Sequence, residues 1–330
     1  MDLFELTKAL VDINSVTGNE GACADFLRTM LDDRGFAVEL QPVSPGRANV
    51  LAFWGTPEVV LSTHLDTVPP FFAASEDEEW IYGRGSCDAK GIVAAQVTAA
   101  ERLVAEGVPD FGLIFLVGEE TISDGARVAN QSPRGAKYII NGEPTDNKLA
   151  IATKGCLQIQ VRTGGKAAHS AYPELGESAI DKLLDVLEDF RRLPLPQDPL
   201  LGISTANIGV ISGGRAANVI PDQAQAHILI RTVADSADLR CEIASLLAGR
   251  CEFEIVKDTP MLEMQRLDGF ETCVVAFTTD LPSLSRWGRP LLLGPGSITV
   301  AHTDHECVRK RDLVHAVDLY CRLVKRLKER

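Results

Sequence analysis

The sequence predicts an α/β protein whose mixed, mostly parallel sheet is sandwiched by helices, with a ferredoxin-like α+β domain inserted into it. Predicted strands and helices alternate along the first part of the chain, which indicates a layered α/β sheet. The apolar runs Val59–Leu61 and Leu113–Val117 are continuous, as is typical of parallel strands buried on both faces. Near Gly155 the pattern changes to the order β-α-β-β-α-β. We therefore expect two domains: a larger one from 1–154 and 260–330, and a smaller one inserted at 155–259.

The first part of the chain begins with two predicted helices. Apolar side chains at helical spacing predict the first helix over residues 3–13. The stretch Thr17–Glu20 has the form of a capping box and predicts that a second helix opens there and runs to Asp33, before Gly35. The elements expected after these are strands at 37–43, 48–54, 58–63, 113–117 and 137–140, and helices at 89–106 and 123–130.

The inserted domain and the segment after it complete the predicted order. The expected elements of the inserted domain are strands at 156–163, 203–212, 222–231 and 251–257, and helices at 177–192 and 235–248. The sheet pattern of the larger domain then resumes with a helix near 269–279 and a strand at 290–293. A final helix is expected at 307–328, with basic residues in its last turns that suit the helix dipole.

Composition limits the class of protein. The chain has 330 residues, of which 45% are hydrophobic and 24% charged, enough for a large core and two domains. Its net charge of -13 and the lack of a basic run argue against a nucleic-acid partner. The acidic N-terminus does not resemble a signal peptide, and no apolar run reaches the roughly 18 residues of a membrane span. The absence of such a run argues against a membrane partner. The eight scattered cysteines are typical of reduced thiols, so we expect a cytoplasmic protein.

Ligand-type side chains follow several predicted strands. His64 ends one strand, and Asp66 lies two residues on, so in an extended chain the two side chains point the same way. Asp66 is therefore placed to support His64 as a metal ligand. The other candidates at strand ends or turns are Asp88, Glu119, Glu120 and Glu143, with His302 far downstream. Open α/β sheets place their sites at such carboxyl ends.

Oxygen and nitrogen ligands without a thiolate suit a pair of divalent metal ions, Zn²⁺ above all, with Co²⁺ or Mn²⁺ as alternatives. Glu119 and Glu120 are adjacent, so on an extended strand end they point opposite ways. One can therefore bind metal while the other transfers a proton. A metal pair with a neighbouring carboxylate as general base is typical of hydrolysis.

The order of these motifs resembles the dizinc deacylase and exopeptidase family, which includes acetylornithine deacetylase, succinyl-diaminopimelate desuccinylase, aminoacylase and glutamate carboxypeptidase. The resemblance covers nearly the whole chain, including the inserted domain. It rests on the stretches His64–Pro69, Gly83–Gly91, Gly118–Glu120, Gly142–Thr145 and Ala301–Glu306.

The resemblance implies specific roles. It implies that two metal ions are held by His64, Asp88, Glu120, Glu143 and His302. Asp88 would bridge both ions, and the peptide bond after it is often cis in the family. Asp66 would support His64, and Glu119 would be the general base. In the deacetylase pattern the ligand is the histidine that follows the alanine, so we expect His302 rather than His305.

The inserted domain carries further candidates by the same resemblance. His169 would stabilise the tetrahedral oxyanion, usually across a homodimer, although a solvated loop histidine is the alternative. Asn218 would lie near the substrate. Arg231 would grip the substrate carboxylate, although a surface ion pair is the alternative. In the larger domain, the glycine loop that contains Gly296 could donate backbone hydrogen bonds to the same end of the substrate.

Together these features lead us to expect a dinuclear metallohydrolase that cleaves the N-acyl amide of a small amino acid. The first expectation is an acetylornithine or acetyl-lysine deacetylase of amino-acid biosynthesis. The alternatives are a succinyl-diaminopimelate desuccinylase and a dipeptidase or carboxypeptidase. An inactive binding protein on this fold would require a lost ligand, and none of the expected ligand or base positions is lost.

Overall fold

The computed structural model describes residues 1–330, which form two compact units. Unit 2 comprises Ala152–Glu263 and Val274–Thr278, and unit 1 comprises the rest of the chain. The insertion expected at 155–259 thus begins a few residues earlier and ends a few residues later in the structure. The segment Val274–Thr278 also joins unit 2, which the sequence did not indicate.

The sheet of unit 1 is mixed and has the order β1-β2-β6-β3-β7-β17-β8, and β16 also pairs with β8; the end of β8 continues into unit 2, where it pairs with β15 as the ninth strand. The central strands β6, β3, β7 and β17 are parallel to one another, and the strands at both sides pair antiparallel. This confirms the predicted fold class. The strands are β1 (Ala37–Ser44), β2 (Arg47–Trp54), β3 (Val59–His64), β6 (Phe111–Leu116), β7 (Tyr138–Asn141), β8 (Leu149–Thr153), β15 (Leu262–Glu263), β16 (Thr272–Val275) and β17 (Arg289–Leu292).

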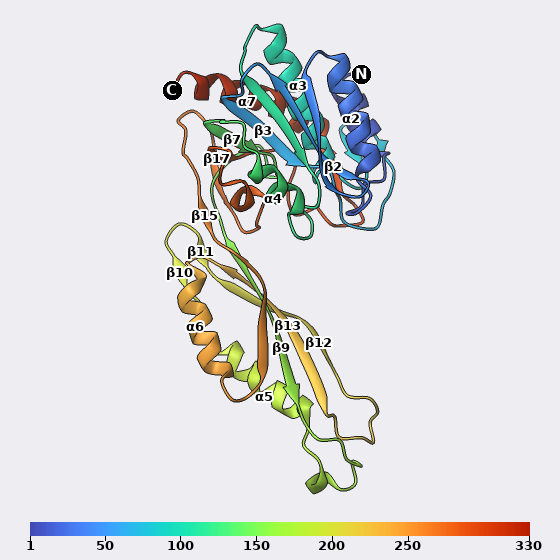
Figure 1. Cartoon of the computed structure of the whole chain (residues 1–330), viewed down its shortest axis with the longest axis vertical. Helices are drawn as coiled ribbons and strands as arrows, with labels where there is room; N and C mark the ends of the chain where they lie inside the picture. The colour runs from blue at the N-terminus through green and yellow to red at the C-terminus, as the bar shows by residue number, and fades with distance from the viewer. The chain divides into compact units, whose positions relative to one another are not determined.

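Helices pack on the sheet of unit 1 (Figure 1). Every residue of β3 and β6 is buried, as the continuous apolar runs predict for strands covered on both faces. One face packs with four helices into a single hydrophobic cluster, in which Leu61 and Phe115 are fully buried. Those helices are α1 (Leu3–Val11), α2 (Gly21–Asp33), α3 (Lys90–Ala105) and α7 (Lys310–Lys328).

The helix α4 (Asp124–Gln131) lies on the opposite face of this sheet. Asn49 alternates with Val50 along β2, and Val50 belongs to the cluster on the first face. The buried Asn49 amide donates hydrogen bonds of 2.9 Å to the carbonyl of Gly125, in α4, and to Gln41. Its oxygen accepts from the amide of Val117 at 3.1 Å. Asn49 thus fixes both ends of the turn that contains Glu119 and Glu120.

A small three-stranded sheet in unit 1 joins segments that are distant in sequence. Its order is β18-β5-β4, and β18 pairs antiparallel with β5. The segment after His302 is therefore hydrogen-bonded to the segment before Asp88. These strands were not predicted; they are β4 (Ser75–Glu76), β5 (Trp80–Tyr82) and β18 (Cys307–Arg309).

Unit 2 has the ferredoxin-like order that the sequence indicated. Its antiparallel sheet runs β12-β13-β9-β14, and α5 and α6 pack against it (Figure 1). The main elements are β9 (Gly155–Gly164), α5 (Ala179–Arg191), β12 (Thr205–Gly213), β13 (Gln223–Thr232), α6 (Ser236–Leu247) and β14 (Glu252–Thr259). The smaller ones are η1 (Pro173–Leu175), β10 (Gln197–Asp198) and β11 (Gly202–Ile203).

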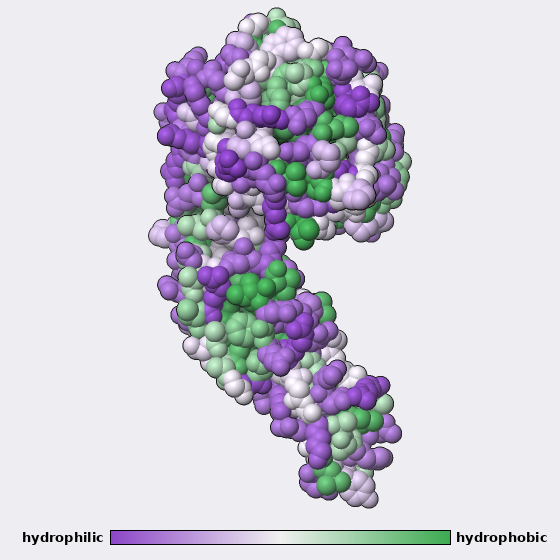
Figure 2. All heavy atoms as spheres, in the orientation of Figure 1, coloured by the Kyte–Doolittle hydropathy of each residue, from purple (hydrophilic) through white to green (hydrophobic).

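The edge strand β12 of unit 2 carries exposed apolar side chains. Val210 and Ile211 are 52% and 54% exposed, and Ile255 and Val256 of the other edge strand, β14, are also exposed. Figure 2 shows apolar residues on the surface of unit 2, interspersed with hydrophilic ones. In neither unit does a helix combine the length and the apolar character needed to span a membrane.

The predicted capping box is wrong. The helix α2 begins at Gly21, and no side chain caps its first turn. The Thr17 hydroxyl instead donates to the Asp66 carboxylate at 2.8 Å. Glu20 accepts from the Gly18 amide and forms two hydrogen bonds with Arg47, of 2.7 and 2.8 Å. The side chains of Thr17 and Glu20 therefore form hydrogen bonds with residues distant in sequence and do not cap the helix.

The helix expected near 269–279 is also wrong. Thr272–Val275 forms the strand β16, which pairs with β8. The amide of Leu149, the first residue of β8, donates to the carbonyl of Glu271 at 2.8 Å. A short segment that contains Val274 and Val275 suits a strand when a partner is available, and only the tertiary structure supplies that partner.

Asn49 provides a test of how unit 1 is held together. Replacing Asn49 with Ala leaves the Val117 amide and the Gly125 carbonyl without their buried partner, so the free energy of unfolding should fall by at least about 2 kcal/mol. All three tryptophans lie in unit 1, so urea unfolding followed by tryptophan fluorescence measures this unit selectively. The exposed Asn19→Ala is the control and should change little. Equal stability of the two variants would contradict the role of Asn49.

Candidate metal centre

The parallel strands of unit 1 bring several ligand-type residues to one edge of the sheet. His64 is the last residue of β3, and it lies opposite Leu116, the last residue of β6. Asn141 ends β7 opposite Ser62 of β3, so Glu143 follows at the same edge. This edge is where open α/β sheets hold their sites.

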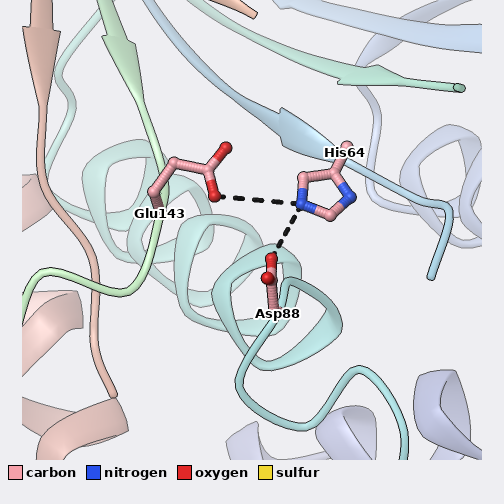
Figure 3. Close-up of side chains that lie close together, drawn as sticks. All are labelled: His64, Asp88 and Glu143. Carbon is pink, nitrogen blue, oxygen red and sulfur yellow. Dashed lines mark hydrogen bonds and ion pairs between the residues drawn. The ribbon is translucent and has the colours of Figure 1, made fainter. Parts of the chain in front are cut away.

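Three of these side chains form the first group: His64, Asp88 and Glu143, drawn in Figure 3. The Nε2 atom of His64 lies 2.9 Å from Oδ1 of Asp88 and 3.9 Å from Oε2 of Glu143. All three residues are buried. Asp88 reaches them from the turn before α3, and the peptide bond after it is cis.

The second group contains Asp88, Glu120 and His302. The Nε2 atom of His302 lies 3.0 Å from Oε2 of Glu120 and 3.4 Å from Oδ2 of Asp88. His302 adopts a left-handed backbone conformation, with φ of 63°, and is half exposed. Asp88 thus directs one carboxylate oxygen to each group. In each group the candidate ligand atoms lie within 4.8 Å of one another.

The chemistry of these donors suits divalent cations. Carboxylate oxygens and imidazole nitrogens are ligands of Zn²⁺, Mn²⁺ and Co²⁺, and no thiolate is among the grouped atoms. The site concentrates buried carboxylates that repel one another. Burial and this repulsion raise the pKa of Glu143 and Glu119. Burial alone would raise the pKa of Asp88, but hydrogen bonds with the two imidazoles lower it. A positive ion between the groups would relieve this repulsion.

Asp66 differs in one respect from its expected role. Its carboxylate lies 3.6 Å from Nδ1 of His64, but the closer acceptor is its backbone carbonyl, at 2.9 Å. The carboxylate instead accepts the backbone amides of Glu119 and Glu120, at 3.1 and 3.2 Å, and the Thr17 hydroxyl. Asp66 therefore orders the turn that carries both glutamates as well as the imidazole.

Asn141 is a residue that sequence reasoning did not assign. Its side-chain amide donates to Oε1 of Glu143 at 3.3 Å, and its oxygen accepts the Ser62 hydroxyl at 2.8 Å. These contacts leave Oε2 of Glu143 facing His64. An asparagine at the end of a buried strand, two residues before a candidate ligand, is the signal that could have indicated it.

The other predicted residues lie elsewhere. Gly296 is buried in unit 1, with φ of 80°. His305 is exposed and belongs to neither group of candidate ligands. His169, Asn218 and Arg231 all lie in unit 2, where the Nδ1 atom of His169 accepts the Ala171 amide at 3.1 Å.

Comparisons with known proteins identify relatives of this chain. A family model described as "Peptidase family M20/M25/M40" matches residues 60–326. A Peptidase M20 domain-containing protein of Schizosaccharomyces pombe is 41% identical, over 98% of this chain and 84% of that protein. A probable carboxypeptidase of Neosartorya fischeri is 36% identical, over 98% of this chain and 86% of that protein.

Solved structures share the fold. A tripeptidase from Staphylococcus aureus superposes with a TM-score of 0.85 at 21% identity, covering 99% of this chain and 98% of that one. A metallo-carboxypeptidase from Sulfolobus solfataricus superposes with a TM-score of 0.82 at 16% identity, over the whole of both chains. At these identities the likeness concerns the fold.

The geometry predicts different effects for the two neighbouring histidines. His302→Ala removes the only imidazole of the second group, so the purified, metal-supplied protein should retain one ion of the pair. His305→Ala, a matched control three residues away, should retain both ions. Elemental analysis of dialysed protein measures the metal content. If the His302 variant kept a full complement of metal, or if the His305 variant lost an ion, the second group would be wrongly assigned.

Proposed function

Because the chain belongs to peptidase family M20/M25/M40 and is a hydrolase of amide bonds, we propose that it is a dinuclear metallopeptidase acting on small peptides with a free carboxyl terminus. The observation that carries the proposal is the placement of Asp88 between two groups of ligand-type side chains. A hydrolase with two adjacent metal positions that share a carboxylate can act on the carbonyl oxygen of the amide and on the oxygen of the attacking water.

Five side chains would hold the ions: His64, Asp88, Glu120, Glu143 and His302. We propose Zn²⁺, with Co²⁺ or Mn²⁺ as alternatives, on the chemistry of the donors. Ions bound there would polarise the amide carbonyl and acidify water. Asn141 and the Asp66 carbonyl would hold Glu143 and His64 in orientation through hydrogen bonds of 3.3 and 2.9 Å.

We propose Glu119 as the general base. Its backbone amide is fixed by Asp66, and it adjoins Glu120 without belonging to either ligand group. Burial and the carboxylates of Asp280, Glu120 and Asp88 raise its pKa, which favours a group that both accepts and returns a proton. Its carboxylate would take a proton from the attacking water and deliver it to the leaving amine.

The names of the curated relatives support the proposed substrate class. Several relatives that are 34–37% identical over nearly the whole chain are named probable carboxypeptidases. These names favour the peptidase alternative over the acetylornithine deacetylase that the motifs put first. A carboxypeptidase must bind a terminal carboxylate. We propose Arg231 for this role, because its Nη1 atom is buried without a hydrogen-bond partner, and we propose that Asn218 and Gly296 assist.

A substrate panel tests the proposed class. With zinc supplied, dipeptides and short peptides with a free carboxyl terminus should be hydrolysed, with release of the last residue. The same peptides with an amidated carboxyl terminus are the matched control and should be cleaved at least about 10-fold more slowly, because a charge-assisted contact is lost. Acetylornithine and succinyl-diaminopimelate complete the panel. Faster hydrolysis of either of these two compounds would overturn the peptidase assignment in favour of a deacylase.

Substitution of the two adjacent glutamates separates their roles. Glu119→Gln should keep both ions and lower turnover by about 10²-fold or more, because proton transfer is removed. Glu120→Gln should lose metal as well as activity. Turnover is measured on the best peptide of the panel, and metal content by elemental analysis. The reverse pattern would exchange the two assignments, and normal turnover in Glu119→Gln would exclude it as the base.

We also propose that the protein is a homodimer that pairs through unit 2, with His169 stabilising the oxyanion from the partner subunit. The exposed Val210 and Ile211 on the edge strand β12 support pairing, since such an edge is a template for another chain.

The oligomeric state tests this pairing. Light scattering should show the mass of a dimer for the wild-type protein, and Val210→Lys should weaken the association. Mixing His169→Ala with Glu119→Gln chains should restore part of the activity. An active monomer would rule out the pairing.

A further inference from the structure

Glu306 is a buried carboxylate in unit 1 that the proposed mechanism does not use. It lies four residues after His302 and has no exposed surface. Its Oε1 atom accepts three backbone amides of the turn before α3: those of Gly85 at 2.9 Å, Cys87 at 3.1 Å and Asp88 at 3.0 Å. Its own carbonyl accepts a fourth amide, that of Gly83, at 3.1 Å.

The second carboxylate oxygen of Glu306 faces a buried cation. The Nη1 atom of Arg84 lies 2.6 Å from Oε2, and both side chains are almost fully buried. Arg84 also donates to the carbonyl of Pro70 at 3.2 Å, and its guanidinium lies 5.0 Å from the centre of the Phe72 ring. Arg84 therefore fixes the orientation of the carboxylate, and the other oxygen is left to the turn.

These contacts connect the two segments that carry Asp88 and His302. One oxygen of Glu306 binds the backbone of Asp88 itself, and the chain that follows Glu306 pairs as β18 with β5. A buried ion pair adds little net stability compared with apolar residues of similar size. Its value here lies in geometry, because three turn amides converge on one oxygen and so fix the backbone from which the Asp88 side chain extends.

We propose that Glu306 is a positioning residue that holds the Asp88 turn ready to bind both metal ions, with Arg84 holding Glu306 in turn. The inference rests on the proposed role of Asp88 as the shared ligand. Asp88 receives its orientation from hydrogen bonds to its backbone, and not from the ions alone. Loss of such supporting contacts typically lowers metal affinity by about 10–100-fold.

Two double variants isolate this role. Arg84→Met with Glu306→Gln removes the ion pair but keeps an oxygen that can accept the turn amides. Arg84→Met with Glu306→Leu has similar volume and no acceptor. Neither variant leaves an uncompensated buried charge. The first should bind Zn²⁺ at least about 10-fold more tightly than the second, because only the first keeps an acceptor for the turn amides. Affinity is measured on metal-free full-length protein by competition with a chelating dye.

Glu58→Gln is the control for loss of an ion pair. Glu58 immediately precedes β3, so it lies at the far end of that strand from His64, and it forms an ion pair with Lys328 at 3.1 Å. This variant should bind metal as the wild type does. Equal affinity in the two folded double variants would overturn the role of Glu306. Failure of the wild-type chain to bind any ion would instead contradict the proposed function.

Hydrogen exchange on the wild-type protein decides the question if the Leu variant does not fold. In the metal-free enzyme, the amides of Gly85, Cys87 and Asp88 should remain protected, because Glu306 holds them without any ion. A peptide that spans residues 83–89 reports this protection by mass spectrometry. Exchange as fast as in an exposed loop would show that the turn is not held before metal binds, and would overturn the proposal.

Discussion

Parallel pairing of β3 with β6 and β7 is the constraint on which the candidate site depends. These strands run in the same direction, so His64, the glutamates after β6 and Glu143 leave the sheet at one edge. A shift of one residue in register would turn the His64 side chain to the other face of the sheet. The register is specified by apolar side chains buried on both faces of β3 and β6, since the ligands themselves repel one another.

That repulsion explains the polar contacts around the site. Burial and mutual charge raise the pKa of Glu119 and Glu143, so the carboxylates would separate if nothing held them. Neutral donors hold two of the segments: the turn of Glu119 is tied to Asp66 by backbone amides, and Glu143 is tied to Asn141. The Asp88 turn is tied to Glu306, which has Arg84 as its counter-ion. The polypeptide therefore supplies a preformed cluster of acceptors whose charge suits a cation.

The chemistry of this cluster is shared by deacylases and peptidases, because both hydrolyse an amide. The choice between them depends on the groups that bind the two ends of the substrate, which fold alone does not reveal. Arg231, with one guanidinium nitrogen lacking a partner, suits a terminal carboxylate, which both peptides and N-acyl amino acids carry. Structural neighbours below 25% identity share this fold, so the closer relatives carry more weight for the substrate class.

The fold class, the ferredoxin-like insertion and the candidate ligands could all be predicted from the amino-acid sequence. These features are encoded locally, as apolar periodicity and as ligand-type residues that directly follow strands. The partner of each polar side chain, in contrast, depends on the packing of distant segments. Thr17 binds Asp66 and not a helix terminus, Val274 lies in a strand and not a helix, and Glu306 binds a turn that lies more than 200 residues earlier. Such partners are distant in sequence, and local pattern carries no information on which of several donors and acceptors the packed chain brings together.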